Sequence, residues 1–309
     1  MDKKSEITLK NATRRKSLYL YIMLAPAVIL LFVFNYVPIY GIIIAFKDYN
    51  LFEGVFGSPW IGFSNFKWFL TDPAFWRVMA NTIKINLYDI GFGFFSPIIF
   101  ALLVNEVEHI RFKKTVQTIS YMPNFLSWVV VAGLVTNLLS PDQNGLVNLI
   151  LMKLFGTKPI FFLAEPKYFV PIIVIADIWK GVGFSSIVYF AAIAGIDTSL
   201  YEAAVIDGAN RLKCVFHITI PSILNIIMIM LIFRVAGIFS IGFERIFLLQ
   251  NALTREVSEV ISTYVYSMGI EKAQFAKTTA IGLTQSFLGL IMVHTSNTLT
   301  KKLTGYGIY

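Results

Sequence analysis

The chain has 309 residues, of which 56% are hydrophobic and only 14% are charged, and its mean hydropathy is +0.69. These values lie far from those of soluble domains and indicate that a lipid bilayer is the main solvent. The formal net charge of +8 does not indicate a nucleic-acid partner, because the basic residues gather beside the ends of apolar runs and form no soluble basic surface.

Long apolar runs predict an all-α, polytopic membrane protein. About 20 apolar residues are needed to cross the hydrocarbon core, and only helices and closed barrels pair all of their backbone polar groups in lipid. A barrel would need short alternating strands, whereas the apolar runs of this chain are long and unbroken. We therefore expect six transmembrane helices in one membrane domain.

The amino-terminal segment 1–17 is basic and precedes a run, 18–46, that contains no charged residue. A secretory signal peptide also begins with basic residues, but its apolar core of about 7–15 residues is roughly half as long as this run. We expect 18–46 to be the first transmembrane helix, retained in the mature protein, with 1–17 in the cytoplasm.

The remaining elements follow in chain order. Segment 47–79 is rich in aromatic residues, Gly and Pro, and is predicted to be an extracytoplasmic loop with short interfacial helices. The block 80–300 is expected to form the membrane core, and 301–309 a cytoplasmic tail. The further predicted spans are 80–104, 116–139, 168–194, 222–248 and 276–298.

Charge distribution sets the expected orientation. Lys and Arg are denser in 1–17, 105–115, 195–221 and the tail than in the three opposite loops. Because cytoplasmic loops carry an excess of basic residues, both chain ends are predicted to be cytoplasmic.

A polar segment of a different kind separates the fourth and fifth spans. Its residues are Glu202-Ala203-Ala204, then Asp207-Gly208-Ala209, and after eight further residues Ile218-Thr219-Ile220-Pro221. Ser199 and Glu202 have the spacing of a capping box, which predicts a short helix that begins at Ser199. Gly208 near its end can take a backbone conformation closed to other residues. Pro221 is expected to start the next membrane helix.

These residues resemble the EAA loop of binding-protein-dependent ABC importers, with Ile220 where the family has Leu. The resemblance implies the type I ABC importer fold, with a cytoplasmic coupling helix near 199–209 in the loop 199–221 that a partner ATPase grips. The residues implied to couple to the ATPase are Glu202, Ala203, Ala204, Asp207, Gly208 and Ala209. The alternative is an amphipathic helix on the membrane surface, which would favour Lys and Arg over two acids and three alanines.

Other motifs extend the resemblance to sugar-importer permeases over about residues 80–300. They are Asn81-Thr82, Pro123, and Trp179 with Gly181 and Gly183. The segments 21–26 and 302–309 resemble the subgroup that imports oligosaccharides released from polysaccharides such as alginate and pectin. The resemblance implies a non-catalytic subunit of the bacterial inner membrane. Its implied partners are a second homologous permease, expected to form a heterodimer, two cytoplasmic ATPase subunits that bind ATP and Mg, an extracytoplasmic solute-binding protein and an oligosaccharide.

Charged residues in or near the apolar runs are candidates for a substrate path, because ionisable groups are costly in a membrane. Asp177 and Lys180 lie three residues apart on one predicted helix and can meet on one face. Basic side chains favour an acidic oligosaccharide, and aromatic rings offer flat faces for sugars. The predicted path consists of Lys84, Tyr88, Asp89, Asp177, Trp179, Lys180, Arg234, Phe239 and Glu244, and Arg245 is a further charge near an apolar run. The alternative is that these ions pair internally or extend to the headgroups.

The chain contains no Gly-x-x-x-x-Gly-Lys-Ser/Thr loop to bind ATP and no metal-ligand spacing, so we expect it to bind no cofactor or metal itself. Two other classes of function would each leave a recognisable pattern in the sequence. A secondary transporter driven by an ion gradient would show two related halves with broken helices and paired intramembrane carboxylates. A membrane-embedded enzyme would show converging acids or a metal cluster at the interface. Neither pattern is evident in the sequence.

Overall fold

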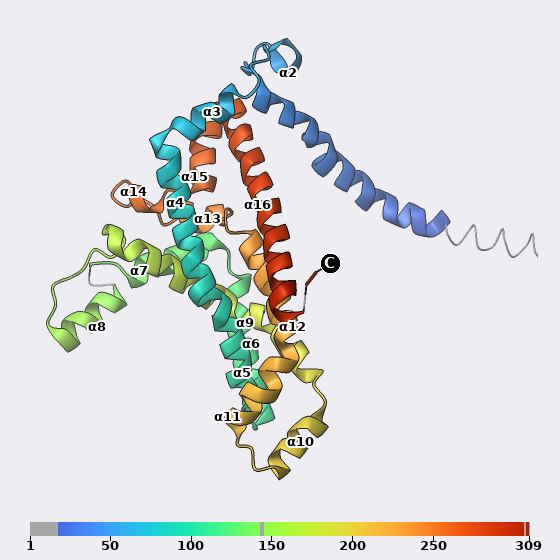
Figure 1. Ribbon diagram of the computed structural model, residues 1–309. Coiled ribbons are helices and arrows are strands. Elements are labelled where there is room, and N and C mark those ends of the chain that lie inside the picture. The colour runs from blue at the N-terminus through green and yellow to red at the C-terminus, as the bar shows by residue number, and fades with distance from the viewer. Residues whose placement is uncertain (1–17, 143–144, 306, 309) are drawn as a thin grey trace, which may run out of the picture. The chain divides into compact units, whose positions relative to one another are not determined.

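The computed structural model describes residues 18–142, 145–305 and 307–308 and divides the chain into two compact units. Unit 1 comprises Met1–Trp68 and Gln274–Leu283, and unit 2 comprises Phe69–Ala273 and Thr284–Tyr309. The regular elements of the described residues are helices, apart from one antiparallel bridge between Lys47 and Trp60 (Figure 1).

Unit 1 begins with a helix over Leu18–Phe46, whose last part passes through a π-helical segment, η1 (Phe32–Tyr36), and a 3-10 segment, η2 (Val37–Phe46). Its end is fixed by Asn65, whose side-chain amide donates to the carbonyl oxygens of Ala45 and Lys47 at 2.9 and 3.0 Å. The predicted loop 47–79 holds the short helices α2 (Gly54–Gly57) and α3 (Ser64–Thr71), and α4 begins within it at Pro73.

Unit 2 contains most of the remaining helices. They are α4 (Pro73–Tyr88), η3 (Asp89–Phe94), α5 (Phe95–Asn105), α6 (Ile110–Tyr121), η4 (Met122–Phe125), α7 (Trp128–Leu138), α8 (Leu146–Phe155), α9 (Pro166–Ala194), α10 (Thr198–Ile206), α11 (Arg211–Cys214), η5 (Val215–Thr219), α12 (Ile220–Ala236), α13 (Phe243–Phe247), α14 (Arg255–Ser258), α15 (Ile261–Tyr266), η6 (Ser267–Glu271) and the larger part of α16 (Phe275–Thr304).

Five helical segments in the described residues are long and apolar enough to cross a membrane: Leu18–Phe46, Pro73–Asn105, Pro166–Ala194, Arg211–Ala236 and Phe275–Lys302. Four of them contain most or all of a predicted span. The fifth, Arg211–Ala236, overlaps the predicted span 222–248 by little more than half of that span's length.

The predicted span 116–139 is not one straight helix. Its residues fall in the pair Ile110–Phe125 and Trp128–Leu138, which is bent by 102°. The bend has a local cause, because Pro123 lacks an N–H and Leu126 is extended. Ser127 then caps α7 by accepting from the Val130 N–H at 3.4 Å. Counting this pair as one span gives up to six crossings.

Pro221 lies in the first turn of α12, as predicted, but the continuous apolar helix that contains it starts earlier. The helix begins at Arg211, where the Asn210 side chain accepts from the Lys213 N–H at 2.9 Å. It continues through η5, in which the Ile220 N–H reaches back to the Val215 carbonyl, and this π-helical register lets the chain pass into Pro221 without a break. The helix ends at Ala236, before the turn from Gly237 to Gly242.

The core of unit 2 forms where α5, α9 and α12 meet, around Phe94, Ile98, Tyr189, Ile193 and Ile223. A second cluster joins α4, α9, α13 and the segment before α15, around Ile85, Phe169, Ile173, Ile246 and Val260.

Helix α6 approaches α9 most closely at Gly183. A Cβ built on Gly183 would lie 2.1 Å from the carbonyl oxygen of Ser120, which leaves no room for a side chain. Small residues permit such close packing of membrane helices.

We therefore expect Gly183→Ala to lower the free energy of unfolding by about 1–3 kcal/mol through overpacking against α6. Gly181→Ala is the matched control on the same helix, because its Cβ would meet only Ser185 Oγ at 4.0 Å. The control should be neutral or more stable by up to about 1 kcal/mol, since Ala favours helix over Gly. Thermal unfolding of the detergent-solubilised protein measures both, and equal unfolding temperatures for the two variants would contradict the argument.

Candidate functional site

The polar segment between the fourth and fifth predicted spans folds into the short helix α10. The predicted start at Ser199 is wrong, because Asp197 is the capping residue and accepts from the Ser199 N–H at 2.9 Å. Hydrogen bonds from the Ser199 backbone and hydroxyl hold the pKa of Asp197 below its ordinary value. An ionised carboxylate at this position also interacts favourably with the positive end of the helix dipole.

The end of α10 is a Schellman motif. Gly208 has φ +78°, its N–H donates to Val205, and the N–H of Ala209 donates to Ala204. Gly208 therefore occupies the left-handed position that the sequence predicted for it. The chain turns sharply here and enters α11 three residues later.

The surface of α10 combines acidic and apolar side chains. Glu202, Ala203, Asp207 and Gly208 are exposed, and Ala204 and Ala209 are half-buried. The sequence reading overlooked Val205 and Ile206, which are 64% and 85% exposed. Two large apolar side chains held in the open beside two carboxylates are typical of a docking surface for another protein.

Two contacts tie this helix to the rest of unit 2. The Tyr201 hydroxyl lies 2.9 Å from Thr219 Oγ1, which is buried in the π-helical turn η5. Arg211 pairs with Glu108 in the connection that precedes α6. The segments 105–115 and 195–221, both predicted to be cytoplasmic, therefore meet at one end of unit 2, where Figure 1 shows α10 and α11.

A cluster of four charges lies in the interior of unit 2. Arg245 on α13 pairs with Asp89, and its Nη1 lies 2.9 Å from Asp177 Oδ2. Arg234 at the end of α12 lies 3.6 Å from Asp89 and 3.9 Å from Asp177. The side chains of Asp89 and Arg245 are only 1% and 6% exposed, whereas that of Arg234 is 40% exposed. Arg245 thus locks the two carboxylates, and Arg234 is held loosely.

A cavity of about 610 Å³ opens beside this cluster, between η3, α5, α9 and α12. Asp177 and Arg234 line it together with Gly181, Ser185, Tyr189 and Phe233. Its size lies in the range of ligand cavities, ~300–1,000 Å³. The Nε of Arg234 is buried and has no hydrogen-bond partner, whereas the side chain as a whole is 40% exposed.

The structure brings together three residues of the predicted path, Asp89, Asp177 and Arg234, and separates the others. The predicted pairing of Asp177 with Lys180 is wrong. Lys180 donates instead to the Asn124 carbonyl at 2.8 Å and lies over the Trp128 ring, because Asp177 faces the two arginines. The remaining predicted residues lie outside the cluster: Lys84, Tyr88, Trp179 and Glu244 are exposed, and Phe239 is half-buried.

The alternative reading of internal ion pairing therefore describes Asp89, Asp177, Arg234 and Arg245. Arg245 was recognised as a charge near an apolar run but not as a site residue. Its position on a helix of five residues, α13, gave no signal in the sequence pattern.

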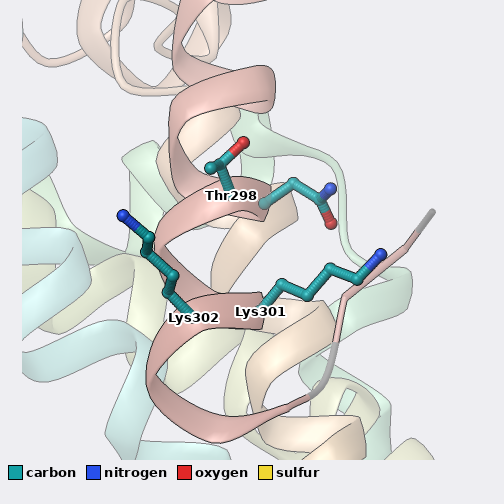
Figure 2. Close-up of a pocket in the computed structure, with 4 residues that line it drawn as sticks. Thr298, Lys301 and Lys302 are labelled. Atoms are coloured by element: carbon teal, nitrogen blue, oxygen red, sulfur yellow. The ribbon is translucent and has the colours of Figure 1, made fainter.

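A smaller hollow lies near the carboxyl end of α16 and is lined by Asn297, Thr298, Lys301 and Lys302. Figure 2 shows that Lys301 and Lys302 extend to opposite sides of the helix, so their charges do not converge on one ligand. Among the described residues, no three His, Cys, Asp or Glu side chains are grouped so as to hold a metal ion.

The charge cluster predicts unequal effects for its two arginines. Arg245→Gln leaves the buried Asp89 without its closest partner and should cost about 3–5 kcal/mol of unfolding free energy. Arg234→Gln removes a longer, more exposed pairing and should cost about 1 kcal/mol or less. Thermal or denaturant unfolding of the purified protein measures both variants, and a larger loss for Arg234→Gln would refute the assignment of Arg245 as the lock.

Comparison with known proteins places these features. Over residues 97–303 the chain matches the family described as "Binding-protein-dependent transport system inner membrane component". The polygalacturonan/rhamnogalacturonan transport system permease protein YteP of Bacillus subtilis (strain 168) is 43% identical over 94% of this chain and 90% of its own length. Protein LplB of the same organism is 38% identical over 96% and 93%.

Two solved structures are also similar. One, of a bacterial ABC transporter involved in the import of the acidic polysaccharide alginate, has a chain that is 39% identical, with a TM-score of 0.86 over 96% of this chain and 99% of that chain. The other, of a bacterial alginate ABC transporter in complex with an alginate pentasaccharide-bound periplasmic protein, gives 38% identity and the same TM-score over 95% and 98%. The chain therefore has the type I ABC importer permease fold and belongs to the inner membrane components of binding-protein-dependent transport systems.

Proposed function

We propose that this chain is the permease subunit of an ATP-driven importer of acidic oligosaccharides. The observation that carries the proposal is that unit 2 contains two separate features, a surface suited to docking and an interior cavity. An exposed acidic and apolar helix, α10, lies at one end, and a cavity that contains a loosely held guanidinium lies in the interior. The relatives named for polygalacturonan/rhamnogalacturonan transport and for import of the acidic polysaccharide alginate support this substrate class. The alternative of an ion-driven secondary transporter finds no support in the comparisons.

This chain would supply the substrate path and the helix α10, which transmits motion, and its partners would hydrolyse ATP. Two cytoplasmic ATPase subunits would bind ATP and Mg, and a groove on one of them would receive α10. Val205 and Ile206 would supply the apolar contact, and Glu202 and Asp207 the charges. A second homologous permease would complete the path, and an extracytoplasmic binding protein would deliver the sugar. Both chain ends are then cytoplasmic, on the same side as α10.

Motion of α10 would reach the membrane helices through two points. The Tyr201–Thr219 contact links it to η5 and so to α12, which carries Arg234. The short connection at Gly195 links it to α9, which carries Asp177. Closure of the ATPases would therefore displace α9 and α12 together and alter the cavity between them.

For an acidic sugar, Arg234 is the proposed carboxylate contact. Its two ion pairs are long, its Nε is unsatisfied, and it lines the cavity. A carboxylate can accept two parallel hydrogen bonds from a guanidinium and carries the opposite charge. A sugar hydroxyl is uncharged and binds a guanidinium more weakly. Arg245 remains paired with both Asp89 and Asp177 while Arg234 binds the cargo.

Gly208→Ala tests whether α10 transmits motion from the ATPases to the membrane helices. Alanine at a left-handed position costs roughly 1–2 kcal/mol, so the end of α10 should shift. We expect sugar-stimulated ATP hydrolysis and uptake to fall severalfold in proteoliposomes that contain the full assembly. Gly156→Ala is the control, because Gly156 has a similar positive φ of +62° but ends α8 and not α10. Undiminished uptake by Gly208→Ala would argue strongly against coupling through α10.

Arg234→Gln tests the carboxylate contact. Uptake of a galacturonate tetramer should fall about tenfold or more, in line with loss of a hydrogen bond to a charged group. Uptake of the neutral galactose tetramer should change little, and Arg234→Lys should restore part of the acidic uptake. An equal loss for both tetramers would assign Arg234 a purely structural role.

A further inference from the structure

A second cavity of about 330 Å³ lies in the segment that joins α12 to α16 and shares no lining residue with the first. Two of its lining residues are aromatic, Phe247 and Tyr266. Six others are polar: Gln250, Asn251, Arg255, Thr263, Ser267 and Glu271. None of these residues belongs to the four-charge cluster or to α10.

The aromatic side of this cavity is firmly built. Phe243 stacks on Phe247 with ring centroids 4.8 Å apart and lies 5.0 Å from the Tyr266 ring. Phe247 and Tyr266 meet edge to face at 5.3 Å. Phe247 nevertheless remains 38% exposed and lines the cavity, so part of this aromatic surface is accessible to a ligand. The C–H face of a sugar ring is flat and apolar, and such a ring face suits it.

The polar side offers hydrogen-bonding groups at fixed positions. Gln250 Oε1 is buried and has no hydrogen-bond partner. A buried acceptor without a donor costs about 1–3 kcal/mol, which a ligand hydroxyl would recover. Ser267 Oγ donates to Glu271 Oε2 at 2.8 Å and orients that carboxylate on the wall. Both residues belong to η6, and π-helical turns occur frequently at functional sites.

The charges around the cavity favour a ligand that is recognised through hydroxyl groups. Arg255 is committed to the buried Glu259, which also accepts from Arg77 at 3.1 Å. Glu271 opposes the charge of Arg255 across the lining. The two charged lining residues, Arg255 and Glu271, therefore sum to no net charge.

The position of this cavity fits an entrance. Figure 1 shows α14 and α15 toward the opposite end of unit 2 from α10. Asn251 donates to the Leu163 carbonyl at 2.6 Å, just before α9, and Asn81, in the first third of the span Pro73–Asn105, donates to the Glu256 carbonyl at 2.8 Å. The cavity is thus fixed to the ends of α4 and α9 that face outward if α10 is cytoplasmic.

We infer that this cavity is a saccharide subsite that receives one sugar ring of the oligosaccharide by aromatic stacking on Phe247 and hydroxyl recognition at Gln250. The inference rests on the proposed function. It adds a second site, which binds a sugar ring, to the first cavity, in which Arg234 binds a carboxylate. The subsite accepts acidic and neutral sugars alike.

The decisive variants are Gln250→Leu and Phe247→Ala in the full assembly with its ATPases and binding protein. The concentration of loaded binding protein needed for half-maximal ATPase stimulation should rise about fivefold, the effect of one hydrogen bond. The rise should be the same for the galacturonate and galactose tetramers, whereas Arg234→Gln discriminates between them. Leu253→Ala is the control, because Leu253 is exposed in the same turn but does not line the cavity. An unchanged half-maximal concentration in both variants would overturn the inference.

A labelling experiment decides the question without disturbing the fold. Ala252 lines the cavity and is exposed, so Ala252→Cys introduces an accessible thiol, with Leu253→Cys as the control outside the lining. Either tetramer should slow maleimide labelling of Ala252→Cys and leave Leu253→Cys unaffected. Equal labelling with and without sugar, or equal protection by the sugar-free binding protein, would overturn the subsite. If the unaltered assembly imports neither tetramer, the proposed function itself fails, which is a separate outcome.

Discussion

The pairing of Asp89 with Arg245 is the constraint on which the interior of unit 2 depends. A carboxylate that is almost fully buried in a membrane protein must be neutralised or paired. Its partner comes from α13, and Asp177 and Arg234 join it from α9 and α12, so one ionic group ties four segments of the chain. The same ion pairs hold Asp177 and Arg234 in place in the wall of the adjacent cavity.

The sequence predicted best those features that depend on local chemistry. Gly208 was expected to end a short helix, and it does so at positive φ. The apolar runs located most of the spans because burial in lipid requires length and hydrophobicity alone. The Ser199–Glu202 spacing predicted a cap at Ser199, but Asp197 caps the helix two residues earlier by accepting from the Ser199 N–H.

Long-range pairing lay beyond the sequence pattern. The partner of Asp177 was sought three residues along its own helix, but it lies on α13, far along the chain. Proline was treated as a helix start at 221 and as an ordinary member of a span at 123. In the structure a π-helical turn carries the helix into Pro221, whereas the chain bends by 102° after Pro123. The presence of a proline alone therefore does not decide between these outcomes.

The composition of the cluster has an electrical consequence. Two aspartates and two arginines sum to zero, so their displacement during a transport cycle carries no gating charge through the membrane field. The transmembrane voltage, worth about 2.3 kcal/mol per elementary charge per 100 mV, would then act on a charged cargo but do no net work on this cluster. For a polyanionic sugar that enters a cell with a negative interior, each carboxylate adds work that nucleotide hydrolysis has to supply.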